Sequence, residues 1–202
     1  MTLSVKILTD RQTEIEMNLP NKLTIIRIIL TPVFLAAMFI NFEYHYVVAA
    51  FIFIVASITD FLDGKIARKH NIVTTFGKLC DPVADKMLTT AAFLAFMQLG
   101  YCNVWIVFVV LTREFLVTSF RLVASAQGVV IPAGIWGKIK TASQMIFFIL
   151  VMILICCIEH FGVHINNLHL ISNILLGITA VLTVISGVKY MIDGKKVIDF
   201  SK

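Results

Sequence analysis

Residues 141–161 read TASQMIFFILVMILICCIEHF, and no charged side chain occurs in this stretch before Glu159. The hydrocarbon core of a bilayer is about 30 Å thick, so roughly 20 apolar residues in a helix cross it. In lipid, every backbone N–H and C=O group needs a hydrogen-bonding partner within the segment, which a helix provides. The stretch therefore predicts a transmembrane helix.

Five other stretches have a similar length and apolar character: 22–41, 45–62, 83–100, 103–124 and 168–192. Gly100, Tyr101 and Cys102 stand at the junction of the third and fourth spans, which predicts a tight helical hairpin. We therefore expect an all-α integral membrane protein with six transmembrane helices.

The composition of the whole chain agrees with this expectation. Hydrophobic residues make up 59% of the 202 residues and charged residues 14%, whereas globular chains average roughly 45–50% and about 25%. This leaves too little polar surface to cover a water-soluble globule. The same numbers exclude a disordered chain, a collagen triple helix and a coiled coil.

The basic residues predict how the helices are oriented. The loops near 42–45, 100–103 and 160–168 contain no Lys or Arg, and nearly all of the 17 basic residues lie in the other connections and the two tails. Because basic loops stay on the cytoplasmic side, we expect both termini in the cytoplasm. The net charge of +5 fits this orientation and anionic lipid headgroups better than a nucleic-acid partner.

Residues 1–17 precede the first span and are polar and weakly amphipathic. Their charged residues exclude the apolar core of a signal peptide. A short amphipathic helix on the inner membrane surface and an unstructured tail are equally good interpretations. We expect one membrane domain over residues 18–202.

Four aspartates lie between the second and third predicted spans. Asp60 and Asp63 are three residues apart, and Asp81 and Asp85 are four apart, so each pair occupies one face of a helix. A short connection makes the two helices antiparallel neighbours, and the four carboxylates can then converge at the cytoplasmic mouth of the membrane. Four close anions need a cation. Oxygen-only ligands indicate Mg²⁺ or Mn²⁺, and two such ions would suit four carboxylates and a pyrophosphate.

A structural interpretation exists for each aspartate taken alone. Asp81 followed by Pro82 fits a helix N-cap with proline at the first helical position. Asp60 and Asp63 could form ion pairs with basic neighbours at a solvated membrane edge. This interpretation does not account for all four spacings together with the glycines and the arginine that accompany them.

The stretch from residue 60 to residue 85 resembles a known signature. It reads Asp60-x-x-Asp63-Gly64-x-x-Ala67-Arg68-x8-Gly77-x3-Asp81-x3-Asp85. All eight of its motif residues match those of the CDP-alcohol phosphatidyltransferases. That family likewise has six spans with the motif across spans two and three, so the resemblance covers nearly the whole chain.

The resemblance implies a role for each motif position. The four aspartates would hold two divalent ions, and Asp85 would also be the base that deprotonates the acceptor hydroxyl. Gly64 would let a cytidine diphosphate group approach the backbone, and Arg68 with Thr74 would bind that group. Gly77 would belong to the same donor site, with a plain loop or packing glycine as the alternative.

Three further stretches resemble the phosphatidylglycerophosphate synthases of bacteria, a branch of this family. The first runs from Asn18 to Arg27. Within it, Asn21 and Thr24 would contact the nucleotide, or would merely cap the first span. Met17 stands where such chains often begin, so residues 1–16 would be an upstream extension or the result of a misassigned start.

The other two stretches, Thr112–Phe115 and Gly137–Thr141, contribute charge in or beside the fourth and fifth spans. A second anion site, for an acceptor carrying its own phosphate, would be formed by Arg113, Arg121, Lys138 and Lys140. One alternative is an internally paired bridge between Arg113 and Glu114. For the two lysines, the alternative is ordinary anchoring at the cytoplasmic surface.

The resemblance implies transfer of the phosphatidyl group from CDP-diacylglycerol to sn-glycerol 3-phosphate, with release of CMP. The enzyme would be a homodimer in the bacterial cytoplasmic membrane, with its active site on the cytoplasmic side. The first alternative keeps the chemistry and changes the acceptor to serine, inositol phosphate or phosphatidylglycerol. A divalent-cation transporter is a second alternative, but it leaves Gly64, Arg68 and Gly77 without a role.

Overall fold

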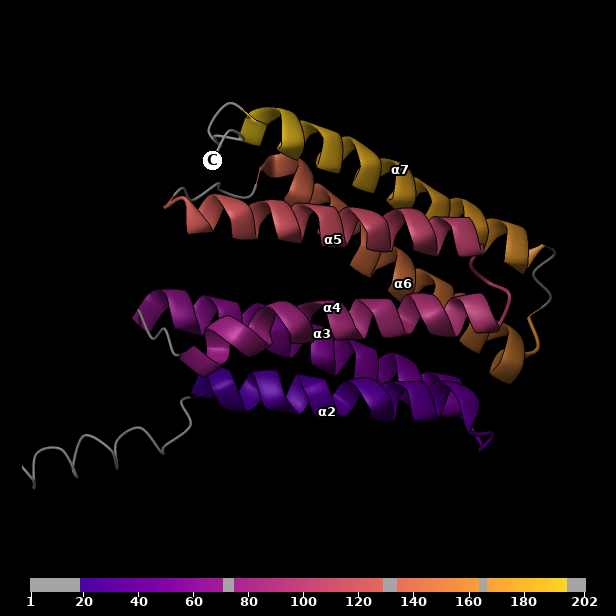
Figure 1. Ribbon diagram of the computed structural model, residues 1–202. Helices are drawn as coiled ribbons and strands as arrows, with labels where there is room; N and C mark the ends of the chain where they lie inside the picture. Colours follow the sequence, from indigo (N-terminus) through magenta and orange to yellow (C-terminus); the bar gives the residue numbers. More distant parts are fainter. Residues whose placement is uncertain (1–18, 71–74, 129–133, 164–166, 196–202) are drawn as a thin grey trace, which may run out of the picture. The chain divides into compact units, whose positions relative to one another are not determined.

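The computed structural model describes residues 19–70, 75–128, 134–163 and 167–195. Within these ranges the chain forms six α-helices (Figure 1), namely α2 Leu19–Phe39, α3 His45–His70, α4 Thr75–Gln98, α5 Val104–Ala126, α6 Ile135–Phe161 and α7 Leu168–Lys195. The predicted all-α class is confirmed, and each predicted span corresponds to one helix. The interfacial segment predicted over residues 1–17 lies outside the described residues.

Three of these helices are long and apolar enough to cross a membrane, judged by length and composition: Asn21–Phe39 in α2, Ile135–His160 in α6, and Leu168–Lys195. In α3 the described apolar segment is shorter, at His45–Thr59. The 23-residue helix α5 has spanning length, but charged side chains interrupt its apolar sequence. Together with the composition, the long apolar helices identify a membrane protein.

The helices are divided between two compact units. The first unit contains α2, the part of α3 from Phe51 onward and the part of α4 up to Ala91. The second unit contains the part of α3 up to Ala50, the part of α4 from Ala92 onward, and α5, α6 and α7.

Aromatic and small residues form the core of the first unit. Phe34 of α2 and Phe53 of α3 are fully buried, and their ring centroids are 5.6 Å apart. Ala56 of α3 and Ala84 of α4 are also fully buried. Small side chains allow helix backbones in a membrane to approach closely, where packing contacts rather than the hydrophobic effect hold helices together.

In the second unit, α7 packs against both α5 and α6 (Figure 1). The buried positions of α7 are mostly small or hydroxyl-bearing: Leu168, Ser172, Leu176, Thr179, Thr183, Ser186, Gly187 and Gly194. A second core lies between α4 and α6, where the fully buried ring of Phe148 meets Phe93 edge-on, with the ring centroids 4.7 Å apart. These contacts hold in place α5 and α6, two helices that carry charged residues of this unit.

The short connection predicted between the third and fourth spans is present. α4 ends at Gln98, and Gly100 has a φ of +80°, a left-handed conformation that suits glycine. Asn103 caps α5 by accepting a hydrogen bond from the Trp105 amide at 3.0 Å. The Asn103 amide donates to the Asn173 side chain at 2.7 Å, which ties the hairpin to the start of α7.

Candidate active site

The signature residues lie on two helices. α3 continues as a helix to His70, so Asp60 and Asp63 share a helical face as predicted. α4 begins at Thr75 rather than near residue 83, which puts Asp81 and Asp85 in its second and third turns. The N-cap interpretation of Asp81 is therefore wrong, because the helix has already begun ahead of it. The charged residues of this stretch lower its hydropathy and conceal the start of the helix.

The described part of the structure includes one of the four carboxylate side chains, that of Asp85. The other predicted site residues of this region fall outside the described side chains: Asp60, Asp63, Gly64, Arg68, Thr74, Gly77 and Asp81. Their roles remain predictions.

Asp85 is joined to α2 by an ion pair. Nη1 of Arg27 donates a hydrogen bond to Oδ1 of Asp85 at 2.6 Å. The Arg27 side chain is 1% exposed, whereas that of Asp85 is 54% exposed. The pair therefore joins a guanidinium inside the first unit to a carboxylate that other molecules can reach. The sequence carries one general indication of this contact, an arginine within an apolar span.

The same side of α2 buries further polar residues. Asn21, Thr24 and Thr31 are all buried along with Arg27, and their spacing keeps them on one side of the helix. Asn21 and Thr24 lie within α2, which begins at Leu19, so the interpretation of these residues as caps is wrong. Four polar side chains buried along one side of a helix face neighbouring protein rather than lipid. α2 therefore presents a polar side to the rest of the first unit.

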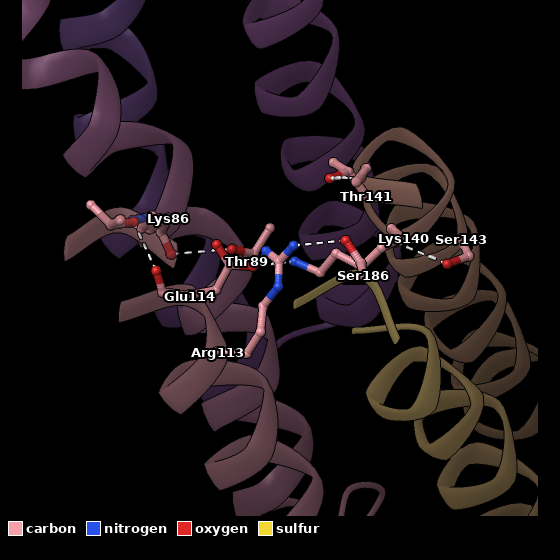
Figure 2. A network of polar contacts seen from close by, with 10 residues as sticks. Lys86, Thr89, Arg113, Glu114, Lys140, Thr141, Ser143 and Ser186 are labelled. Atoms are coloured by element: carbon pink, nitrogen blue, oxygen red, sulfur yellow. Dashed lines mark hydrogen bonds and ion pairs between the residues drawn. The ribbon is translucent and has the colours of Figure 1, made fainter. Parts of the chain in front are cut away.

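A second charged cluster lies in the second unit, where residues of α5, α6 and α7 meet (Figure 2). Oε1 of Glu114 accepts hydrogen bonds from Nη1 of Arg113 at 3.2 Å and from Nζ of Lys140. Nη2 of Arg113 donates to the Ser186 hydroxyl at 2.7 Å. The exposed fractions of the side chains are 7% for Lys140, 14% for Arg113 and 23% for Glu114. The Arg113–Glu114 bridge is thus present, and Lys140 is part of the same cluster.

Close packing of α7 holds the arginine of this cluster. A Cβ atom added at Gly187 would lie 2.8 Å from Cγ of Arg113, closer than such atoms approach one another. Sequence reasoning missed both Gly187 and Ser186. Adjacent small residues within an apolar span are a signal of helix–helix contact, but that signal does not indicate which residue the helix meets.

The other two basic residues of the predicted acceptor site have different surroundings. The guanidinium carbon of Arg121 lies 5.7 Å from the centroid of the Tyr190 ring, and Nε of Arg121 is 3.5 Å from the Tyr190 hydroxyl oxygen. Lys138 is exposed near the start of α6. The structure therefore brings Arg113 and Lys140 together on Glu114 and does not bring Arg121 or Lys138 into that contact.

The comparison with known proteins agrees with the signature. Residues 17–185 match the family model described as CDP-alcohol phosphatidyltransferase. The chain belongs to this family. It is 43% identical over 141 residues to a CDP-diacylglycerol–glycerol-3-phosphate 3-phosphatidyltransferase of Bacillus subtilis, an alignment that covers 64% of this chain and 73% of that protein.

Other relatives within the CDP-alcohol phosphatidyltransferase family align over more of the chain. A protein of the same name from Rickettsia felis is 40% identical over 182 residues, which cover 90% of this chain and 98% of the relative. A probable phosphatidylglycerophosphate synthase of Mycobacterium tuberculosis is 38% identical over 177 residues, covering 86% of this chain and 80% of the relative. The expected resemblance is confirmed along nearly the whole chain.

The CDP-alcohol phosphatidyltransferase family is generally dependent on divalent metal ions. Among the described residues, no group of three or more His, Cys, Asp and Glu side chains could hold a metal ion. The signature adds Asp60, Asp63 and Asp81 to the exposed carboxylate of Asp85. This donor set contains only carboxylate oxygens and fits a hard divalent cation.

Proposed function

We propose that this chain transfers the phosphatidyl group of CDP-diacylglycerol to sn-glycerol 3-phosphate, producing phosphatidylglycerol phosphate and CMP. The proposal rests above all on the 40% identity, over 90% of this chain, with a relative that carries the name of this activity. The complete signature on α3 and α4 supports the chemistry, and the cationic cluster on α5 and α6 supports the choice of acceptor.

The proposed membrane arrangement has six spans, with both termini and the active site on the cytoplasmic side of a bacterial cytoplasmic membrane. The six helices supply enough segments, and the loops without Lys or Arg near 42–45, 100–103 and 160–168 support the orientation. Association into a homodimer is part of the same proposal.

In the proposed donor site, Asp60, Asp63, Asp81 and Asp85 hold two Mg²⁺ or Mn²⁺ ions. When bound, these ions would neutralise the negative charge of the pyrophosphate. The cytidine diphosphate group would be bound by Gly64, Arg68, Thr74 and Gly77, together with Asn21 and Thr24. The polar side of α2 supports a role for the last two, because Arg27 on that side contacts Asp85.

Asp85 is the proposed general base of the reaction. Its carboxylate takes the proton from the C1 hydroxyl of glycerol 3-phosphate, and that oxygen attacks the β-phosphorus of CDP-diacylglycerol. The bond between this phosphorus and the bridging oxygen breaks, and CMP leaves with the bond's electron pair. The proton then passes from Asp85 to water, which the exposure of its side chain allows. No covalent enzyme intermediate is required, because positioning and electrostatic stabilisation supply the catalysis.

The acceptor phosphate is proposed to bind at Arg113 and Lys140, with Arg121 and Lys138 nearby in the sequence. Within the cluster, Arg113 and Lys140 lie close enough together to donate to the same carboxylate oxygen of Glu114. A phosphate group would accept charge-assisted hydrogen bonds from these two cations. Of the alternative acceptors, serine carries no phosphate group.

The test is CMP release from CDP-diacylglycerol and Mg²⁺ with each acceptor alcohol supplied separately. We expect release with glycerol 3-phosphate and a raised KM for glycerol 3-phosphate in Arg113→Ala. Good activity with another alcohol, and none with glycerol 3-phosphate, would contradict the proposed acceptor. An unchanged KM in Arg113→Ala would contradict the proposed phosphate site.

A further inference from the structure

The ion pair between α2 and α4 is difficult to explain as a stabilising contact. Arg27 is almost completely buried, while its partner Asp85 is about half exposed. Removing a guanidinium from water is costly, and replacing a buried ion pair with well-packed apolar side chains is often neutral or stabilising. An apolar side chain of similar volume at position 27 would serve the packing of α2 at least as well.

The chemistry of the pair suits a role for Arg27 in orienting the carboxylate of Asp85. A guanidinium is planar, remains charged at every physiological pH and donates hydrogen bonds in fixed directions. Arg27 holds Oδ1 of Asp85 at 2.6 Å, while the exposed part of the same carboxylate remains accessible. The donor itself has little freedom, because its side chain is enclosed within the first unit.

We propose that Arg27 is a positioning residue that fixes the carboxylate of Asp85 in its reactive orientation. This inference rests on the proposed function, since it assumes that Asp85 accepts the proton. Arg27 touches neither substrate in the proposed reaction and acts through Asp85. A misplacement of a reacting group by about 1 Å can slow a reaction by on the order of 100-fold, so the effect should appear in kcat.

The experiment compares Arg27→Met, Arg27→Lys and the control Thr31→Val. Methionine fills the buried space without charge, and lysine retains the charge without the planar donor group. Thr31 is buried one turn further along α2, and its hydroxyl donates at 2.9 Å to the backbone carbonyl of Arg27. Kinetics are measured in detergent or lipid vesicles, and the melting temperature of each variant is measured alongside.

We expect Arg27→Met to lose on the order of 100-fold in kcat, with KM values for both substrates and the melting temperature close to those of the wild type. Arg27→Lys should recover part of kcat, because the charge at position 27 is retained. Thr31→Val should retain the wild-type kcat.

An unchanged kcat in Arg27→Met would overturn the inference, as would a kcat that falls only in step with the melting temperature. A change confined to KM would also overturn it. All variants are compared using whichever acceptor supports CMP release by the wild type. A wrong acceptor is therefore detected in the wild type, and a wrong role for Arg27 is detected in the variants.

Discussion

Glutamine in place of Glu114 would remove a negative charge that Arg113 and Lys140 both contact. The side chain keeps its size, so the change acts mainly on charge. Breaking a fully buried pair from one side costs about 3–5 kcal/mol, because the remaining charge stays buried. Glu114 is 23% exposed, and solvent screening reduces the expected loss to roughly 2–3 kcal/mol.

The expected loss can be measured as a change in melting temperature. For a chain of this size, each kcal/mol corresponds to about 2–4 °C, so Glu114→Gln should melt about 4–12 °C below the wild type. The assay is thermal unfolding in a mild detergent, followed by far-UV circular dichroism. Glu43→Gln is the matched control, because Glu43 is an exposed acid outside the helices.

A second variant tests the cause of the loss. Adding Lys140→Met to Glu114→Gln removes the more deeply buried of the two cations, and much of the lost stability should return. A melting temperature for Glu114→Gln equal to that of Glu43→Gln would refute the reasoning. So would a double variant that is less stable than Glu114→Gln, because the buried lysine would then stabilise the fold without its carboxylate.

Three other predictions follow from the structure and the proposed site. Gly187→Ala should destabilise the protein by about 1–3 kcal/mol, because its Cβ would meet Arg113. Gly177→Ala, whose Cβ would have an ordinary contact at 4.0 Å with Ile106, is the control in the same melting assay, and equal melting temperatures would contradict the prediction. Burial raises the pKa of the Cys102 thiol to about 12. A variant with Cys102 as its single cysteine should therefore react with iodoacetamide at pH 8 far more slowly when folded than when unfolded. Equal reaction rates in the two states would contradict this prediction. Removal of divalent ions with a chelator should abolish CMP release and Mg²⁺ should restore it, whereas release that persists in the chelator would count against the proposed metal site.

The sequence predicted the helices well because hydropathy is a local property. It was less accurate where charge lies within a helix. The predicted starts of α4 and α6 were residues 83 and 141, whereas the helices begin at Thr75 and Ile135. In both cases charged residues occupy the first turns, so the helix begins before the apolar pattern does.

The contacts between distant residues could not be predicted in the same way. Asp85 was predicted from its spacing within the signature, but its partner Arg27 is 58 residues away, and no local periodicity connects the two. Lys140 was open to interpretation as a surface anchor, yet it is buried against Glu114. Tertiary packing decides which of several nearby basic residues is buried, and a single sequence does not contain that information.

The distance along the chain between Arg27 and Asp85 has a consequence for biogenesis. Synthesis at about 5–20 residues per second places roughly 3–12 s between the two residues. During this interval α2 can enter the membrane before Asp85, the partner of Arg27, has been synthesised. The long Arg27 side chain can extend toward the membrane surface until α4 arrives. The burial of Arg27 against Asp85 is therefore a late event, completed only when α4 packs against α2.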